Sequence, residues 1–165
     1  MTLATTPATT PAALSLIREG RPLIDVRAPV EFAQGGLPGA VNLPLMIDDE
    51  RHQVGIAYKQ QGQAAAIVLG ERLVSGEVKQ ARIAVWQAYL AEHPDAVIYC
   101  FRGGLRSQIA QQWLEEAGLS RPRLAGGWKA MRQALCERID QAARQPMLVV
   151  AGLTGCAKTT LINQL

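Results

Sequence analysis

The sequence predicts an α/β protein whose doubly wound parallel sheet has about five strands. Short apolar runs typical of buried strands alternate along the chain with longer segments of helical character. The clearest strand, "DAVIYC", is followed at once by the clearest helix, "RSQIAQQWLEEAG". With 165 residues, 48% of them hydrophobic and 19% charged, the chain is long enough for one domain with a proper core and the start of another.

The first elements follow in order from local signals. Residues 1–11 are rich in Thr, Ala and Pro and are expected to form a flexible tail. "AALSLIREG" predicts a short helix that ends at Gly20, and "PLIDV" predicts a buried strand. A short helix and a Gly-Pro turn then lead to a second strand around Ala40 to Leu43. A helix is expected from Glu71 to Leu90, weakened at Gly76, with Val85 among its apolar positions.

The second half of the chain adds two more elements and a boundary. "PRLAGGW" predicts a short strand that runs into a glycine turn, and "KAMRQALCERIDQAARQ" predicts a final helix. Pro146 ends this pattern, and "MLVVAGLTGCAKTTLINQL" opens a new strand, loop and helix. We therefore expect an N-terminal tail at 1–11, an α/β domain at 12–143 and the truncated start of a second domain at 146–165.

The net charge and the cysteines indicate what the protein could bind and in which compartment it is expected. The net charge of +3 and the pI near 9.0 permit an anionic partner such as RNA, although so small an excess is weak support. Cys100, Cys136 and Cys156 are an odd count at wide spacing, which argues against a disulfide framework and against a metal site. The N-terminus lacks a secretory signal and no apolar run could span a bilayer. The expected location is the cytoplasm, without membrane attachment.

The stretch "YCFRGGLRSQ" carries the chemistry. Cys100 falls at the carboxyl end of a predicted strand and Ser107 at the start of the next helix, the sheet edge where ligands bind in open α/β folds. Gly103 and Gly104 permit a tight curl, whose N–H groups at a helix start make an anion cradle. That cradle, with a cation from Arg102 or Arg106, favours the thiolate form of the cysteine.

Several chemistries suit such a thiolate, because it can attack sulfur, selenium or phosphorus. The alternative is a buried structural thiol beside solvated arginines, but the convergence of Cys, Gly, Arg and Ser at one junction favours a function. No histidine adjoins the loop, which disfavours a Cys-His hydrolase. The spacing of five residues between Cys100 and Arg106 also suits a phosphatase. We rank that activity third, because "FRGGLR" holds no acidic residue to serve as general acid.

Several segments of the sequence, taken together, resemble a known family. "LIDVRAPVEFAQGGLPGAVNLP" resembles the N-terminal signature of rhodanese-like domains, the Cys100 loop falls where their nucleophile belongs, and "LAGGWKAMR" resembles their closing strand and turn. The resemblance covers roughly residues 12–143. Within the family, "ERHQVGIAYKQQGQAAAIVLGERLVSG" and "CFRGGLRS" most resemble the tRNA 2-selenouridine synthases.

That resemblance implies a rhodanese domain followed by a P-loop domain. It implies replacement of sulfur by selenium in 2-thiouridine at a tRNA wobble position, through a geranylated intermediate. Selenophosphate and geranyl diphosphate would be substrates, tRNA a partner, and a selenophosphate-supplying enzyme a possible second partner, with no cofactor firmly implied. A stand-alone thiosulfate or persulfide sulfurtransferase and a non-catalytic anion-binding module remain alternatives. Cys100 would be the nucleophile, the substrate-binding residues would be Arg102, Gly103, Gly104, Arg106 and Ser107, and Ser107 would also cap the following helix.

"GLTGCAKTT" resembles a Walker A loop, in which Ala157 replaces the usual second glycine. Lys158 would contact phosphate and Thr159 would approach a metal ion, with Gly152 and Gly155 shaping the loop. An ordinary strand–glycine–helix turn with a surface lysine is the alternative. Because the rest of a P-loop sheet is missing from the sequence, we expect this chain not to bind a nucleotide tightly.

Other polar and aromatic residues have weaker signals. Asp25 and Arg27 are expected to form a structural charged pair, and Glu31 is ambiguous. Cys136 is expected to pack in a helix, and the tryptophans are expected to pack rather than to stack on RNA. A solvated loop and a surface that faces tRNA or a further domain are equally favoured for Arg51, His52, Tyr58 and Lys59.

Overall fold

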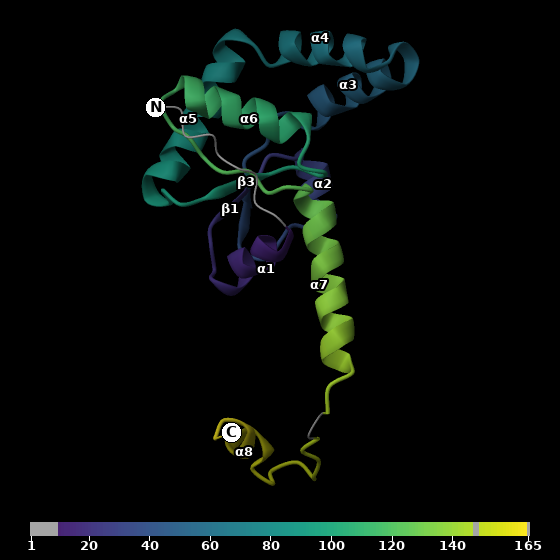
Figure 1. Ribbon diagram of the computed structural model, residues 1–165, viewed down its shortest axis with the longest axis vertical. Helices are drawn as coiled ribbons and strands as arrows, with labels where there is room; N and C mark the ends of the chain where they lie inside the picture. The colour runs from purple at the N-terminus through teal and green to yellow at the C-terminus, as the bar shows by residue number, and fades with distance from the viewer. Residues whose placement is uncertain (1–9, 147–148, 165) are drawn as a thin grey trace. The chain divides into compact units, whose positions relative to one another are not determined.

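A computed structural model describes residues 10–146 and 149–164, and the side chains from residue 14 on. Most of the predicted tail therefore lies outside the described residues, although Thr10 and Pro11 begin a helix. The chain divides into two units, Met1–Leu135 and Cys136–Leu165, which are considered separately. The helices and strands are labelled in Figure 1: α1 Thr10–Arg18, β1 Leu23–Asp25, α2 Pro29–Ala33, β2 Ala40–Asn42, α3 Asp48–Gln61, α4 Gln63–Leu73, α5 Gly76–Glu92, β3 Val97–Tyr99, α6 Leu105–Glu116, α7 Gly127–Ala143 and α8 Lys158–Ile162.

The sheet has three parallel strands in the order β2-β1-β3, with Ile24 of β1 opposite Val41 on one side and Ile98 on the other. The expectation of about five strands is wrong for the described residues. "PRLAGGW" contributes only an isolated bridge between Arg123 and Ile98. The backbone leaves the strand direction directly afterwards, because Gly126 and Gly127 both have positive φ angles.

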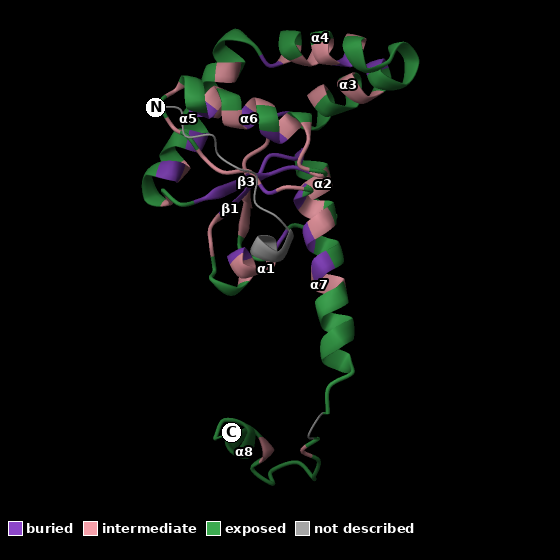
Figure 2. Ribbon diagram, in the orientation of Figure 1, coloured by how far each residue is buried: buried purple, intermediate pink, exposed green. Residues whose placement is uncertain are grey.

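Helices cover both faces of the sheet, so the doubly wound arrangement is confirmed. On one face Ile24 and Ile98 pack with Trp86 of α5 and Leu114 of α6. On the other face Leu23, Val97 and Tyr99 pack with Leu16 of α1 and Met131 of α7. Figure 2 colours much of β1 and β3 as buried. All residues of these two strands are buried, which explains why they appear in the sequence as short apolar runs.

The long helix expected from Glu71 to Leu90 is divided, since α4 ends at Leu73 and α5 begins at Gly76. Val85 lies on the solvent side of α5, 53% exposed, and does not join the core. The segment that contains Arg51 and Tyr58 is helical rather than a loop. It forms α3, which packs against α4 across a turn at Gly62 as a helical hairpin (Figure 1).

The second unit contains the predicted glycine loop and its helix. Of the strand expected before that loop, Val149 and Val150 have no regular secondary structure, and Met147 and Leu148 lie outside the described residues. The helix α8 has only five residues. No helix in residues 10–146 or 149–164 combines the length and hydrophobicity that crossing a membrane requires.

Candidate active site

Cys100 lies directly after β3 and is 3% exposed, against the core that covers one face of the sheet. Its Sγ is 3.3 Å from the Oγ of Ser107, which accepts a hydrogen bond from the thiol. The carbonyl oxygen of Gly104 lies farther away, at 3.8 Å. Ser107 is fully buried, and its hydroxyl donates to that same carbonyl over 3.0 Å. The thiol is thus held by the loop and by the first turn of α6.

We call residues 100–106 the reactive loop. Its carbonyl groups bond to a second segment of the chain. The N–H of Trp128 donates to the Cys100 carbonyl over 2.9 Å, and the N–H of Lys129 donates to the Phe101 carbonyl over 3.0 Å. The Nη1 of Arg123 donates to the Gly103 carbonyl over 3.1 Å. None of these supporting residues was expected from the sequence. The adjacent glycines of "LAGGW" were the one available signal that this turn approaches another backbone closely.

The N–H groups of the same loop remain available. In the described part of the chain, no hydrogen-bond acceptor pairs with the backbone N–H groups of residues 101 to 106. Since the carbonyls bond to Arg123 and to the first turn of α7 while the N–H groups do not, the loop can offer several donors to an anion. This is the arrangement that an anion cradle needs.

The expectation that Ser107 caps α6 is wrong. The helix begins at Leu105 with Gly104 as its N-cap residue, and no side chain caps it. Ser107 therefore lies inside the first turn, where its hydroxyl faces Cys100. The curl ends earlier than the sequence indicates, because Gly103 has a φ of 66° and Gly104 is already at the helix start.

The two arginines of the loop have different surroundings. Arg106 forms a bidentate ion pair with Glu31 of α2, and its Nη2 lies 3.1 Å from Oε1. Arg51 approaches the same carboxylate, at 3.8 Å. Burial acts to raise the pKa of Glu31, but the hydrogen bonds from Arg106 and the positive charges of both arginines hold it below its ordinary value. Arg102 is exposed, with its guanidinium 5.9 Å from the ring of Phe101.

Asp25 and Arg27 form the expected structural pair. Both are buried, and the Arg27 guanidinium bonds to both carboxylate oxygens over 2.6 to 3.0 Å. Burial opposes the charge on Arg27, but Asp25 raises the pKa of that guanidinium. Asn42 of β2 donates to the carbonyls of Asp25 and Arg27, so the pair and the neighbouring strand end are joined.

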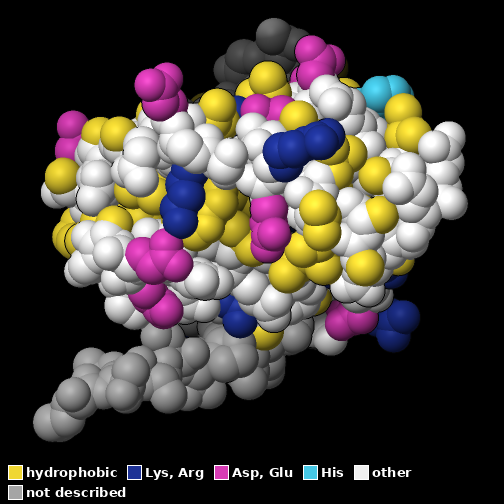
Figure 3. All heavy atoms as spheres, turned by 90° about the horizontal axis from the view of Figure 1, so that it is seen from above, with side chains coloured by type: hydrophobic (Ala, Val, Ile, Leu, Met, Phe, Trp, Pro, Cys, Tyr) yellow, Lys and Arg dark blue, Asp and Glu magenta, His cyan; other side chains and the backbone are white. Residues whose placement is uncertain are grey.

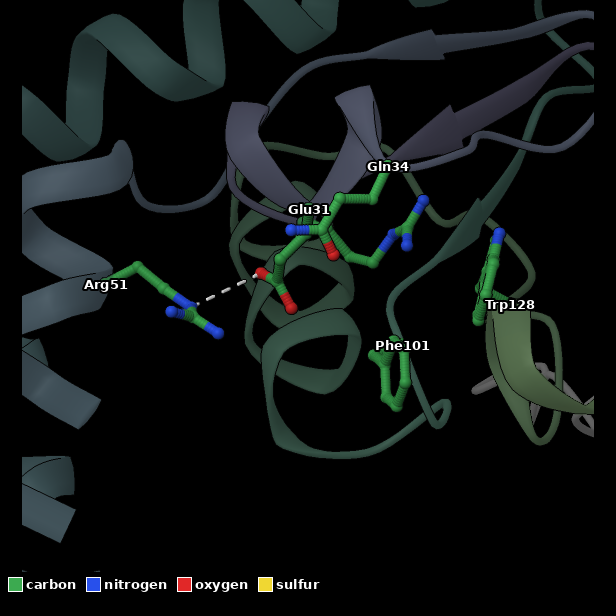
Figure 4. Close-up of a pocket in the computed structure, with 6 residues that line it drawn as sticks. Glu31, Gln34, Arg51, Phe101 and Trp128 are labelled. Atoms are coloured by element: carbon green, nitrogen blue, oxygen red, sulfur yellow. Dashed lines mark ion pairs between the residues drawn. The ribbon is translucent and has the colours of Figure 1, made fainter. Parts of the chain in front are cut away.

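A small pocket of about 320 Å³ opens beside the reactive loop (Figure 4). Phe101 and Trp128 form one wall, with their rings stacked and their centroids 5.4 Å apart. Glu31 and Arg51 lie opposite, joined by the ion pair drawn in the figure. Trp86 is buried, as expected of a packing residue, whereas Trp128 is partly exposed at this pocket. Within residues 10–146 and 149–164, no group of three His, Cys, Asp or Glu side chains could hold a metal ion.

The Walker-like loop lies in the second unit. Ala157 has a φ of 57° and is the one non-glycine residue with a positive φ in the described ranges. The position thus requires the conformation that a glycine adopts without strain. The Nζ of Lys158 donates to the carbonyls of Gly152 and Leu153, over 2.9 and 2.7 Å. Gly155 also has a positive φ, and Thr159 lies exposed in α8.

Known proteins resemble most of this chain. The model of the rhodanese-like domain family matches residues 9–134. A tRNA 2-selenouridine synthase from Chromohalobacter salexigens is 70% identical over 145 residues, which cover 88% of this chain and 40% of that protein. One of the same name from Bordetella bronchiseptica is 62% identical over 146 residues, 87% of this chain and 40% of that protein.

A solved structure gives the same picture of the fold. It is the N-terminal domain of a Clostridium difficile 630 protein to which ATP or GTP binding has been ascribed. It matches with a TM-score of 0.67 and 34% identity, covering 79% of this chain and 98% of that one. The chain spans about 40% of the length of the two curated relatives, so its likeness to them concerns one part of those proteins.

Proposed function

Because the chain belongs to the rhodanese-like family, we propose that Cys100 is the nucleophile of a sulfur or selenium transfer that converts 2-thiouridine to 2-selenouridine in tRNA. The identity of 70% to a tRNA 2-selenouridine synthase supports the choice of substrate. The whole reaction belongs to the longer protein that such relatives represent, and this chain supplies its chalcogen-carrying part.

The observation that carries the proposal is the arrangement of the Cys100 loop. The thiol lies beside Ser107, and the loop carbonyls bond to Arg123 and to the first turn of α7. The N–H groups of residues 101 to 106 have no partner among the described residues, so they can stabilise an anion formed on the thiol. A persulfide, formed from a sulfane donor, is such an anion.

In the loading step, Cys100 takes up one sulfur atom from a sulfane donor such as thiosulfate. The Cys100 thiolate attacks the outer sulfur of thiosulfate and forms a new S–S bond. The S–S bond of thiosulfate breaks, and sulfite leaves with the electron pair. The sulfur left on Cys100 carries the negative charge within the cradle of N–H groups.

The tRNA reaction proceeds through a geranylated intermediate with selenophosphate as the donor. Geranyl diphosphate alkylates the sulfur of 2-thiouridine and releases diphosphate. S-Geranyl-2-thiouridine, selenophosphate and water then give 2-selenouridine, geranylthiol and phosphate, which conserves all atoms and needs no oxidant. Partners would be tRNA and an enzyme that supplies selenophosphate, and the site of action would be the cytoplasm. In the longer protein, the residues for the diphosphate would be Gly152, Gly155, Lys158 and Thr159.

Mass spectrometry of the thiosulfate-treated chain tests the proposal. The peptide that contains Cys100 should gain the mass of one sulfur atom, and Cys100→Ser should lose the adduct. Cys156→Ser is the matched control, because Cys156 is an exposed thiol outside the reactive loop. In a parallel assay the chain should release no phosphate from an aryl phosphate, since Glu31 already binds the guanidinium of Arg106.

Four other results would each contradict the proposal in a different way. Sulfur on Cys156 alone would mean that exposure decides the reactivity. No adduct, together with retained anion binding, would indicate a non-catalytic binding module. Phosphate release that depends on Cys100 would indicate a phosphatase. A sulfur adduct without any selenium transfer in the full-length protein would favour a stand-alone sulfurtransferase.

A further inference from the structure

Trp128 contacts the reactive loop through its backbone and through its side chain. Its N–H donates to the Cys100 carbonyl over 2.9 Å. Its indole ring stacks on the phenyl ring of Phe101, with the centroids 5.4 Å apart and the planes at 21° to each other. Figure 4 shows the two rings side by side at the small pocket. The residue that follows the nucleophile is therefore held by a ring as well as by hydrogen bonds.

A buried arginine supports the indole ring. The guanidinium carbon of Arg27 lies 5.0 Å from the ring centroid of Trp128, within the range in which a cation is attracted to an indole ring. Arg27 is 2% exposed, and its guanidinium is fixed by hydrogen bonds to both carboxylate oxygens of Asp25 and to the Gly35 carbonyl. Trp128 thus packs against a group that has little freedom to move, and Phe101 packs against Trp128.

The orientation of two peptide groups depends on where Phe101 lies. In a trans peptide the carbonyl and the N–H point in opposite directions. The carbonyls of Cys100 and Phe101 both accept hydrogen bonds from the first turn of α7. The N–H groups of residues 101 and 102 belong to the same two peptides, so they point away from α7. They are two of the donors that the loop can offer to an anion.

We propose that the indole ring of Trp128 is a positioning group that keeps the N–H groups of residues 101 and 102 turned toward an anion bound at Cys100. The ring acts through its stacking on Phe101 and does not touch the anion itself. This role rests on the function proposed above in that Cys100 is the reactive residue. It goes beyond that function, because it concerns the affinity of the loop for a small oxyanion whether or not sulfur is transferred.

Protection of Cys100 by sulfate tests this role. Iodoacetamide is uncharged, so its reaction with the thiol does not need the anion site, whereas a sulfate ion in the cradle blocks its approach. Mass spectrometry gives the alkylation rate of the Cys100 peptide as sulfate is raised at constant ionic strength. In Trp128→Ala the sulfate concentration that halves this rate should rise about tenfold, because the stacking contact that orients the donors is lost.

Two further variants test the same contact. In Trp128→Phe a phenyl ring can still stack on Phe101, so sulfate protection should stay within about threefold of that in the unchanged chain. Phe101→Leu removes the stacking from the loop side and leaves Arg27 and α7 untouched. It should weaken sulfate protection by a factor similar to that for Trp128→Ala. It also decides the question if circular dichroism shows that Trp128→Ala does not fold.

Trp113→Ala is the matched control. Trp113 of α6 is also a partly exposed tryptophan that stacks on another ring, that of Trp86, at 6.0 Å. It lines a larger groove between α6 and the α3–α4 hairpin. Figure 3 looks onto this end of the molecule, where hydrophobic side chains lie exposed between scattered charged groups. The variant should lose stability in urea but keep normal sulfate protection of Cys100.

Normal sulfate protection in folded Trp128→Ala or in Phe101→Leu would overturn the proposal. Weak protection in Trp128→Phe would exclude stacking as the cause, and weak protection in Trp113→Ala would show that any loss of packing has the same effect, so both would also overturn it. Sulfur loading from thiosulfate is measured separately. Protection that depends on Trp128 without any loading counts against the proposed function alone. Loading without such protection counts against the role of Trp128 alone.

Discussion

Gly103 of the reactive loop and Gly127, the first residue of α7, meet backbone to backbone. A Cβ on Gly103 would lie 2.7 Å from the backbone N of Gly126, and a Cβ on Gly127 would lie 2.6 Å from the N of Gly103. Both residues also have positive φ angles, 66° and 57°. The close approach brings the N–H groups that follow Gly127 within reach of the Cys100 and Phe101 carbonyls. The reactive loop is therefore shaped by two segments of the sequence.

Gly127→Ala should damage both stability and reactivity. The new methyl group would overlap the Cys100 carbonyl and the Gly103 N–H, both of which are backbone groups that cannot rotate away. We expect a loss of about 3 kcal/mol in the free energy of unfolding, measured by urea denaturation. Sulfur loading of Cys100 should fall with it, because the loop can no longer keep its curl.

Gly20→Ala is the control for Gly127→Ala. It separates the backbone strain of a positive φ angle from the steric overlap of the new Cβ. Gly20 has nearly the same φ, 63°, but a Cβ added to it would have no neighbouring atom within 4 Å. It should lose only about 1 kcal/mol, the cost of the left-handed conformation, with normal sulfur loading. Equal losses in the two variants would show that the contact between Gly103 and Gly127 contributes nothing.

The sequence located the reactive loop but not the residues that support it. Cys100, Gly103 and Gly104 could be placed because a strand end, a glycine pair and a helix start are local patterns. The partners of the loop are distant in sequence, so no local pattern indicates them. Arg106 pairs with Glu31, 75 residues away, and Arg123 reaches Gly103 across 20 residues.

The helical hairpin was missed for a different reason. Most of α3 is exposed, and among its described side chains only Ala57 is buried, so the segment has little of the apolar periodicity that marks a helix in sequence. The strand count was too high because "PRLAGGW" has strand composition, yet its glycines turn the backbone away after the bridge at Arg123. Tertiary contacts overrode local preference in both cases.

Ser107→Ala should slow the loading of Cys100. The variant removes the hydroxyl that lies 3.3 Å from Sγ and leaves the Gly104 carbonyl with one donor fewer. A hydrogen bond of this kind is worth about 1 kcal/mol, so the second-order rate of loading with thiosulfate should fall about fivefold to tenfold. Stopped-flow detection of released sulfite measures this rate.

Ser75→Ala is the control for that comparison, because its hydroxyl bonds to the Arg72 carbonyl on the surface, far from Cys100 in the sequence. Its loading rate should be unchanged. If Ser107→Ala also loads at the normal rate, the hydroxyl has a packing role only.

Glu31→Gln should change how stability depends on pH. The pKa of Glu31 lies below its ordinary value of 4.5 in the folded chain, so the unfolded chain takes up a proton first as the pH falls. The ion pair thus contributes its full stability above pH 4.5, and this contribution is lost as the pH falls through the folded-state pKa. At neutral pH the variant should be less stable by about 1 to 3 kcal/mol.

Urea denaturation at neutral pH and below the ordinary carboxyl pKa measures this effect. The difference between Glu31→Gln and the unchanged chain should shrink at the lower pH. Glu116→Gln is the control, since Glu116 pairs with Lys79 on the surface, and it should change stability little at either pH. A difference for Glu31→Gln that stays constant with pH would contradict the assignment of its lowered pKa.

The Walker-like loop of this chain should not bind a nucleotide tightly. Its lysine ammonium, the group that would contact phosphate, bonds to the carbonyls of Gly152 and Leu153. Ala157 holds a left-handed conformation at a cost of about 1 kcal/mol, and α8 adds only five residues behind the loop. Calorimetry with magnesium ATP should therefore give no binding heat at micromolar concentrations. If heat appears and Lys158→Ala removes it, the loop binds phosphate in this chain and the prediction is wrong. Heat that persists in Lys158→Ala would place the nucleotide elsewhere.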